Sequence, residues 1–293
     1  MTVGLTSSVI GEDGHRKAPT EPPEYPDFRA VEVTFEERLA VVTLGSDPKR
    51  ANPSDKMTPE LTEFFRLVRY DPRVRAILIQ GRGRDFSSGG NVKGMQEQAS
   101  RMGNIAENPD WVARLPVDRS DELPMAILGV DVPIVAAVTG HAIGAGLGLV
   151  MWSDYSVMDE TAKIGDPHVR RGLVSPGAYA FPALIGLPRA RALVLTGKLI
   201  DGERAERIGL INEAVPFEDV IPTARAVAED FATLPPLALR WTKRMLNNMA
   251  REQFARYQLE GAALEALTML STDHAEAVAA WLDRQPKPEF RGR

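Results

Sequence analysis

Cysteine is absent from this chain of 293 residues. Without thiols the protein forms no disulfide bond, has no thiolate nucleophile and lacks the ligands of the usual structural zinc site. Histidine is scarce as well, and the four histidines are scattered without the spacing of metal ligands. Catalysis must therefore use other groups, and we expect no bound metal.

Long apolar runs and clusters of basic residues are also absent. No apolar stretch reaches the length needed to cross a bilayer, and the first residues lack the basic and apolar segments of a signal peptide. The 35 basic and 40 acidic residues give a net charge of −5, without the Lys/Arg stripe that follows nucleic-acid phosphates. We expect a cytoplasmic protein that binds neither membranes nor nucleic acid.

The residues that are present can build a large core, because 44% of them are hydrophobic. Residues 1–27 differ from the rest, since their prolines and charges cannot supply a packed face, and we expect a flexible arm there. Residues 95–122 show poor periodicity, and a stretch of this length is either a functional lid or loosely ordered; we favour the lid.

Strand and helix patterns alternate at first and then give way to helices, which is typical of an α/β fold. A helix follows Thr58, which we expect to cap it, and ends at Asp71-Pro72. We expect strands at 31–35, 39–44, 76–80, 133–138, 155–158, 162–164 and 214–215, and further helices at 144–152, 189–196, 202–208, 217–234, 236–250, 251–270 and 272–284.

Two glycine-rich turns each follow a predicted strand. They read GRGRDFSSGGNV at residues 81–92 and GHAIGAGLG at residues 140–148. Glycine lets the backbone approach a ligand where a Cβ atom would obstruct it. Together the turns resemble two halves of an oxyanion hole, in which backbone N–H groups stabilise a negatively charged oxygen.

The motifs are similar to those of the crotonase (enoyl-CoA hydratase/isomerase) superfamily. Residues 85–95 resemble its first signature and residues 140–154 its second. Later landmarks follow in the family's order at residues 188–190, 195–197, 205–212 and 242–243.

This likeness spans about residues 30–285 and implies a particular architecture. We expect a crotonase-like ββα spiral core over residues 28–200. A C-terminal helical region, residues 201–293, would then carry the trimer contacts. Its apolar side chains exceed what one helical layer needs, which favours a homotrimer or a dimer of trimers.

The resemblance also implies a chemistry, in which an acyl thioester of coenzyme A forms an enolate stabilised by two backbone N–H groups. Carried over by position, these donors are Gly90 and Ala145. Ala145 would lie at a helix start, where N–H groups and the helix dipole favour negative charge. The resemblance further places Ser88, Asn91, Val92, Gly144, Gly148, Asp166 and Pro167 at the substrate.

Coenzyme A would enter as part of the substrate, so no separate cofactor is expected. The loop at Lys49, Arg50, Ala51 and Pro53 matches the family segment that closes over coenzyme A. Lys49, Arg50 and Lys243 are candidate phosphate partners, because clustered cations favour a polyanionic ligand.

The chain departs from the family's hydratases at both catalytic glutamates. Gly148 and His168 stand in their places. A glycine cannot transfer a proton, so the usual two-carboxylate hydration is not expected. A lyase or isomerase with altered proton-transfer residues is the leading hypothesis.

His168 can transfer protons near neutral pH. Pro167 holds the preceding residue extended, so Asp166 and His168 project to a similar side and can couple. A histidine here resembles that of the family's C–C bond hydrolases of β-diketones, although the aspartate that follows in those enzymes is missing from residues 174–178.

Other interpretations stay open. An acid from the lid, Asp110, Asp118 or Glu122, could replace a missing glutamate. A non-catalytic acyl-CoA-binding protein would also account for the loss of both glutamates. A dinucleotide-binding turn at residues 144–149 is a weak match, because Leu149 stands where that motif has its last glycine.

Overall fold

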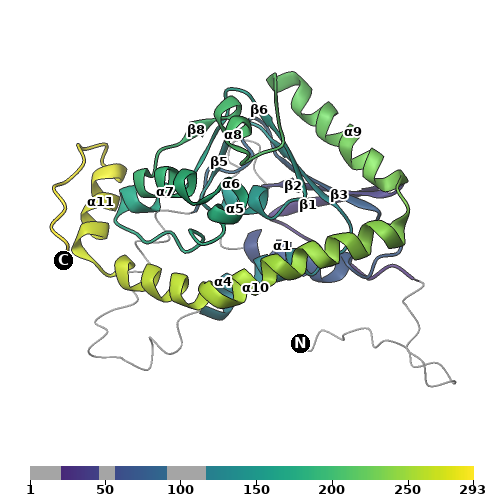
Figure 1. The fold of residues 1–293 in the computed structure, drawn as a ribbon, viewed down its shortest axis with the longest axis horizontal. Helices are drawn as coiled ribbons and strands as arrows, with labels where there is room; N and C mark the ends of the chain where they lie inside the picture. The colour runs from purple at the N-terminus through teal and green to yellow at the C-terminus, as the bar shows by residue number, and fades with distance from the viewer. Residues whose placement is uncertain (1–20, 46–56, 91–116) are drawn as a thin grey trace.

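The computed structural model describes residues 21–45, 57–90 and 117–293, with the backbone alone given for 117–121. These residues form a six-stranded sheet of order β1-β2-β3-β4-β6-β9 and a three-stranded sheet of order β5-β7-β8 (Figure 1). Within the larger sheet, β1 and β2 are antiparallel and the other neighbours are parallel. The strands are β1 (Val31–Glu36), β2 (Leu39–Leu44), β3 (Ala76–Gly81), β4 (Ile134–Val138), β5 (His141–Ile143), β6 (Tyr155–Asp159), β7 (Lys163–Gly165), β8 (Ile200–Asp201) and β9 (Glu213–Val215).

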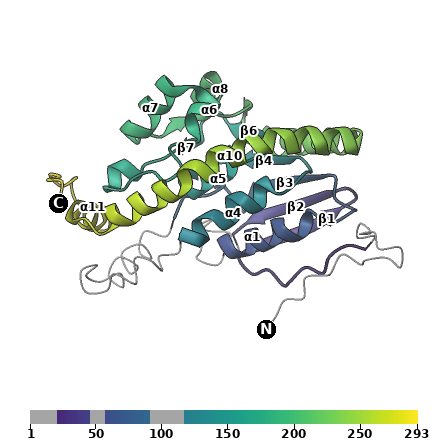
Figure 2. The same cartoon turned by 60° about the horizontal axis from the view of Figure 1, so that its bottom comes forward.

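Helices cover the sheets and make up most of the last third of the chain. Figure 2 shows α10 running lengthwise across the molecule, with α11 beyond its carboxyl end. The described helices are α1 (Met57–Val68), α4 (Val117–Leu128), α5 (Ala145–Met151), η1 (His168–Arg171), α6 (Phe181–Ile185), α7 (Leu187–Thr196), α8 (Gly202–Ile208), η2 (Phe217–Asp219), α9 (Val220–Thr233), α10 (Pro236–Met269) and α11 (Thr272–Leu282).

The larger sheet is buried on both faces, as the apolar run of β3 predicts. Successive side chains of a strand point to opposite faces. Ile77 and Ile79 therefore belong to the core cluster that includes Phe64 of α1. Leu78 belongs to a second cluster with Ala224 of α9 on the other face. The expected α/β layering is confirmed.

Parallel pairing of β3 with β4 positions the two glycine turns. Ile77 pairs with Ile134 and Gln80 with Ala137, so both strands end at the same edge of the sheet. The chain leaves β3 into the first turn and β4 into the second. Ligands of α/β sheets commonly bind beyond the carboxyl ends of strands.

Three local predictions are wrong. Thr58 does not cap α1, because the helix has begun by Met57 and the Thr58 carbonyl accepts a bond from the Thr62 hydroxyl inside it. The lid predicted to extend to residue 122 gives way to α4 at residue 117. The two helices expected over 236–270 are the single helix α10, since no proline or glycine interrupts it near residue 250.

The predicted N-terminal arm, residues 1–27, is described only from residue 21. Tyr25 packs its ring against Phe35 and Phe64, with centroids 4.9 and 6.2 Å apart. Its hydroxyl donates a hydrogen bond of 3.0 Å to the buried Asp71. The domain boundaries themselves stay a prediction. No helix among the described residues is long and apolar enough to span a membrane.

Lys243 is not a surface cation, so its assignment as a phosphate partner is wrong. Its side chain is buried in α10, where Nζ donates to the Val132 carbonyl at 2.7 Å and pairs with the carboxylate of Asp154. Asp154 in turn accepts a bond from the amide of Ile134 at 2.7 Å. Lys243 therefore ties α10 to the start of β4.

Replacing Lys243 with Met should lower the free energy of unfolding by about 3 kcal/mol, because it leaves Asp154 and a buried carbonyl without their partner. Urea denaturation measures the change. Lys198→Met is the matched control at an exposed lysine and should shift stability by less than about 0.5 kcal/mol. Equal stability of the two variants would contradict the anchoring role of Lys243.

Candidate active site

Backbone hydrogen bonds join the two glycine turns. Phe86 donates to the Thr139 carbonyl at 2.8 Å and Ser87 to the His141 carbonyl at 2.7 Å. Ile143 returns a bond of 3.0 Å to the Ser87 carbonyl. The segment after β3 therefore runs parallel to β5. Two stretches more than fifty residues apart in sequence become neighbours.

Glycines allow this close approach. Gly89 has a φ of +93°, and a Cβ there would lie 3.1 Å from the Ile143 carbonyl oxygen. A Cβ on Gly146 would lie 2.5 Å from Cβ of Ser87, closer than real side chains come. The start of α5 therefore rests directly against the first turn, and only glycine fits at position 146.

The first turn of α5 lies at this junction. Ala145 is its first residue, and the preceding Gly144 provides no side-chain cap. The first N–H groups of an α-helix have no acceptor within the helix. Gly90 and Ala145, the expected oxyanion donors, both line one cavity beside this helix start. Their convergence on a single oxygen stays a prediction.

The cavity has a volume of about 1310 Å³, which is ample for a small-molecule substrate. Side chains from α4, α5, η1, α10 and α11 form its wall. Most of these side chains are apolar: Leu123, Ile127, Ile143, Leu147, Trp152, Leu173, Phe181, Leu199, Phe254, Val278, Trp281 and Leu282. The expected site residues found in the wall are Ser88, Gly90, Gly144, Ala145, Gly148, Asp166, Pro167 and His168.

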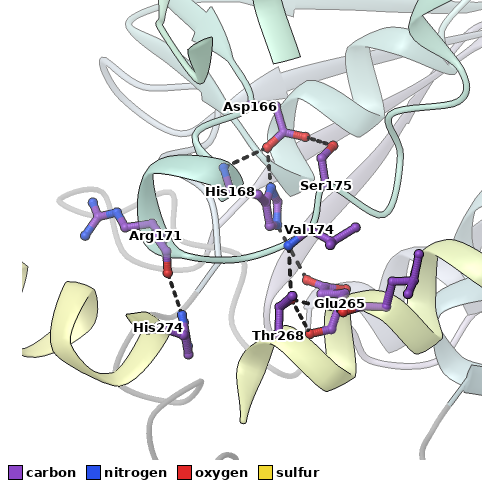
Figure 3. Close-up of polar contacts among 9 residues, drawn as sticks. Asp166, His168, Arg171, Val174, Ser175, Glu265, Thr268 and His274 are labelled. Carbon is purple, nitrogen blue, oxygen red and sulfur yellow. Dashed lines mark hydrogen bonds and ion pairs between the residues drawn. The ribbon is translucent and has the colours of Figure 1, made fainter. Parts of the chain in front are cut away.

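His168 and Asp166 form a hydrogen-bonded pair in this wall (Figure 3). Nδ1 of His168 contacts Oδ1 of Asp166, and the backbone N–H of His168 donates to the same oxygen at 3.0 Å. The other carboxylate oxygen accepts a bond from the Ser175 hydroxyl. The predicted coupling of Asp166 with His168 is confirmed, and its local cause is this turn, in which the side chain of Asp166 accepts the N–H two residues on.

The imidazole of His168 lies over the start of α5. A Cβ built on Gly144, which has a φ of +55°, would lie 3.8 Å from Cε1 of His168. The candidate proton carrier and the helix start that carries Ala145 therefore occupy the same corner of the cavity.

Glu265 completes this group, and the sequence analysis missed it. Its carboxylate, from α10, lies 3.6 Å from Nε2 of His168. Gly261, one helical turn earlier, lets α10 approach closely, since a Cβ there would lie 2.5 Å from the Pro176 carbonyl oxygen. A glycine within a long helix was the available signal, because such glycines often mark close packing.

Two carboxylates hold His168 in its charged form. Burial lowers the pKa of His168, but hydrogen bonds to Asp166 and Glu265, together with their charges, outweigh burial and raise it to about 10. For Asp166, burial opposes the charged form, whereas the bonds from His168 and Ser175 dominate and lower its pKa. At neutral pH the site holds an imidazolium, which donates protons and stabilises negative charge.

Gly148, in place of the first family glutamate, faces open space. A Cβ at this position would meet no atom within 4 Å, and the residue lines the cavity. No group of the described part of the chain therefore fills the space that the missing side chain leaves.

The structure does not place most of the remaining expected residues. Lys49, Arg50, Ala51, Pro53, Asn91, Val92 and Asp110 lie outside the described residues, as does the side chain of Asp118. Glu122, one of the candidate replacements for a lost glutamate, pairs with Arg66 at 3.8 Å on the surface and is not in the described cavity wall. Among the described carboxylates, Glu265 lies beside Nε2 of His168, on the side of the ring opposite to Asp166.

The fold and the cavity define an α/β protein with a polar cluster in an apolar pocket, and comparisons with known proteins place it in a family. The sequence model of the enoyl-CoA hydratase/isomerase family matches residues 34–293. The chain therefore belongs to the enoyl-CoA hydratase/isomerase family, within the crotonase superfamily.

Individual relatives support this assignment. The chain is 30% identical over 259 residues to "Probable enoyl-CoA hydratase echA8" of Mycobacterium leprae, covering 88% of this chain and 96% of the relative. It is 31% identical over 273 residues to "Probable enoyl-CoA hydratase" of Bacillus subtilis, covering 90% of this chain and 100% of the relative.

A solved structure agrees with this fold assignment. The crystal structure of an enoyl-CoA hydratase/isomerase from Mycobacterium paratuberculosis superimposes with a TM-score of 0.78 at 28% identity. The match covers 88% of this chain and 99% of that chain. The expected crotonase-like core with a helical C-terminal region is confirmed.

Substitution by alanine should have opposite effects on stability at two glycines of α5. Gly148→Ala adds a methyl group to open space and removes a flexible helical residue, so the free energy of unfolding should stay equal or rise by up to about 1 kcal/mol. Gly146→Ala forces α5 away from Ser87, so this substitution should lower the free energy of unfolding by about 2 kcal/mol. Urea denaturation compares them, and equal effects would contradict the close junction of the turns.

Asp166→Asn should lower the pKa of His168, because the amide keeps the size of the side chain but removes its charge. The raised pKa stabilises the wild-type fold fully below about pH 6.5, and this contribution disappears as pH rises through about 10. NMR titration of the imidazole nitrogens measures the shift. Asp85→Asn, which removes the carboxylate beside the exposed His141, is the control and should leave the titration of His168 unchanged. A His168 titration that is the same in Asp166→Asn as in the wild type would rule out this pairing.

Proposed function

We propose that the protein is an enzyme that forms and stabilises the enolate of an acyl-CoA thioester. The N–H groups of Gly90 and Ala145 would donate to the thioester oxygen, and each such donor contributes about 3 kcal/mol to transition-state stabilisation. Coenzyme A enters with the substrate, and no separate cofactor is required. Membership of the family and the hydrogen-bonded junction of the two turns support this proposal.

The observation that carries the proposal is the position of His168 over the start of α5. An imidazolium there would stabilise the developing enolate and return a proton to it. Glu265, beside His168, is the described carboxylate best placed to remove the proton next to the thioester carbonyl. This division of roles is that of an isomerase or lyase, in which one carbon loses a proton and another gains one or loses a leaving group.

Ordinary hydration is not part of the proposal. Water addition by the family route uses two carboxylates, and this chain has Gly148 and His168 at those positions. The open space at Gly148 supplies no group that could orient the attacking water.

A C–C bond hydrolase of the β-diketone type is the second candidate, and the contact of Asp166 with His168 favours it. In that reaction a water oxygen attacks one carbonyl carbon, and the bond from that carbon to the carbon between the carbonyls breaks. The electron pair passes to the second carbonyl as an enolate, which then takes up a proton. Asp166 would take the place of the aspartate missing from residues 174–178.

Self-association is a further part of the proposal. The first half of α10 carries large apolar side chains that are more than half exposed: Leu237, Trp241, Met245, Leu246 and Met249. A continuous apolar face of this kind favours a subunit contact. We infer a homotrimer or a dimer of trimers, in line with the family.

Incubation with a panel of acyl-CoA thioesters in heavy water, followed by mass spectrometry, tests the chemistry. We expect exchange of the hydrogen next to the thioester carbonyl without addition of water. His168→Ala should slow the exchange by at least about 100-fold, because it removes the charged proton donor. His141→Ala, at an exposed histidine outside the described cavity wall, is the control and should retain wild-type rates.

The products separate the candidate functions. Cleavage of a β-diketone that depends on His168 identifies the hydrolase. Tight binding of acyl-CoA without any exchange or product identifies a non-catalytic binding protein and refutes the enzyme.

A further inference from the structure

The cavity contains a second charged group that the proposed chemistry does not use. Arg171 lies in its wall, three residues after His168 in η1. Nη1 of its guanidinium is buried and has no hydrogen-bond partner. Among the described residues, no carboxylate lies within ion-pair distance of Arg171, whereas Asp166 and Glu265 both pair with His168.

The surrounding structure holds Arg171 in place. Its carbonyl accepts a bond of 2.7 Å from Nδ1 of the buried His274 in α11. Its guanidinium stacks on Trp281 of the same helix, with Cζ 4.3 Å from the ring centre. Gly172, with a φ of +70°, brings the two elements together, since a Cβ there would lie 2.9 Å from the His274 nitrogen. The side chain is fixed by packing, without a charged partner.

A buried guanidinium N–H group without an acceptor, such as that of Nη1, is unfavourable because it has lost water and gained no partner. Burial accordingly lowers the pKa of Arg171. A guanidinium remains charged in proteins, so an anion in the cavity would satisfy it. Its fork of N–H groups matches a carboxylate with two parallel hydrogen bonds.

The direction of Arg171 indicates which part of a substrate it would meet. In Figure 3 its guanidinium points away from the imidazole of His168, although both residues line the same cavity. The neighbouring wall is largely apolar, formed by Val278, Trp281 and Leu282, with Arg284 as a second cation in the lining. A hydrocarbon chain that ends in a carboxylate suits this region, because the chain contacts the apolar side chains and the carboxylate meets Arg171.

We propose that Arg171 binds a carboxylate at the far end of the acyl group, so that the preferred substrates are coenzyme A thioesters of dicarboxylic acids. This inference rests on the proposed action on acyl-CoA thioesters. It adds the substrate class and a residue that determines specificity.

Isothermal titration calorimetry with the full chain tests the inference. Each dicarboxylic thioester, from malonyl-CoA to adipyl-CoA, is compared with the neutral acyl-CoA of the same carbon number. At the chain length that fits, the carboxylated ligand should bind at least about tenfold more tightly. Arg171→Met should abolish this preference by weakening only the carboxylated ligand, and Arg171→Lys should restore part of it.

Arg170→Met is the matched control. Arg170 is the exposed neighbour, bonds the Thr196 carbonyl at 2.7 Å and is not in the described cavity wall. Its replacement removes the same charge from the same turn and should leave the preference unchanged.

The outcomes distinguish this inference from the function on which it rests. Equal binding of carboxylated and neutral ligands by the wild-type protein overturns the role of Arg171 and leaves the acyl-CoA function standing. Weaker binding of coenzyme A alone to Arg171→Met assigns the guanidinium to a phosphate and also overturns it. Failure of every acyl-CoA to bind the wild type refutes both. Should Arg171→Met misfold by circular dichroism, the wild-type comparison and Arg171→Lys still decide.

Discussion

The hydrogen bonds between the segment at residues 86–87 and β5 are the constraint on which the site depends. They fix the first glycine turn against the start of α5, so residues of two distant segments line the same cavity. Side chains could not replace this arrangement, because the contact at Gly146 leaves no room for a Cβ. The glycines therefore leave main-chain atoms exposed at this junction. Main-chain N–H groups remain in place when a side chain is substituted.

The fold was largely predictable because its signals are local. Apolar runs such as that of β3 indicate strands buried on both faces, and the spacing of apolar residues in α1 indicates one inward stripe. Predictions failed where tertiary packing decides the outcome. The burial of Lys243 depends on neighbours that no short window of sequence contains, and so does the start of α4.

The site was predictable only in part, for the same reason. The pairing of Asp166 with His168 is local, since only Pro167 separates them in a turn. The approach of Glu265 is not, because it requires α10 to pass over the loop at Pro176. The charge of His168 depends on both carboxylates, and residue type alone suggests a neutral-range acid or base. In the structure the two carboxylates raise the pKa of His168, so the residue keeps its proton throughout the neutral pH range.

The uninterrupted length of α10 has a mechanical consequence. Lys243 fastens one part of the helix to β4, and Glu265 reaches the cavity about 33 Å further along at 1.5 Å per residue. The exposed apolar side chains lie on the same helix, on both sides of Lys243 in the sequence. A neighbouring subunit that contacted this part of α10 and tilted the helix about Lys243 would also move the carboxylate of Glu265 beside His168. The exposed apolar face and the carboxylate beside His168 thus lie on one continuous helix.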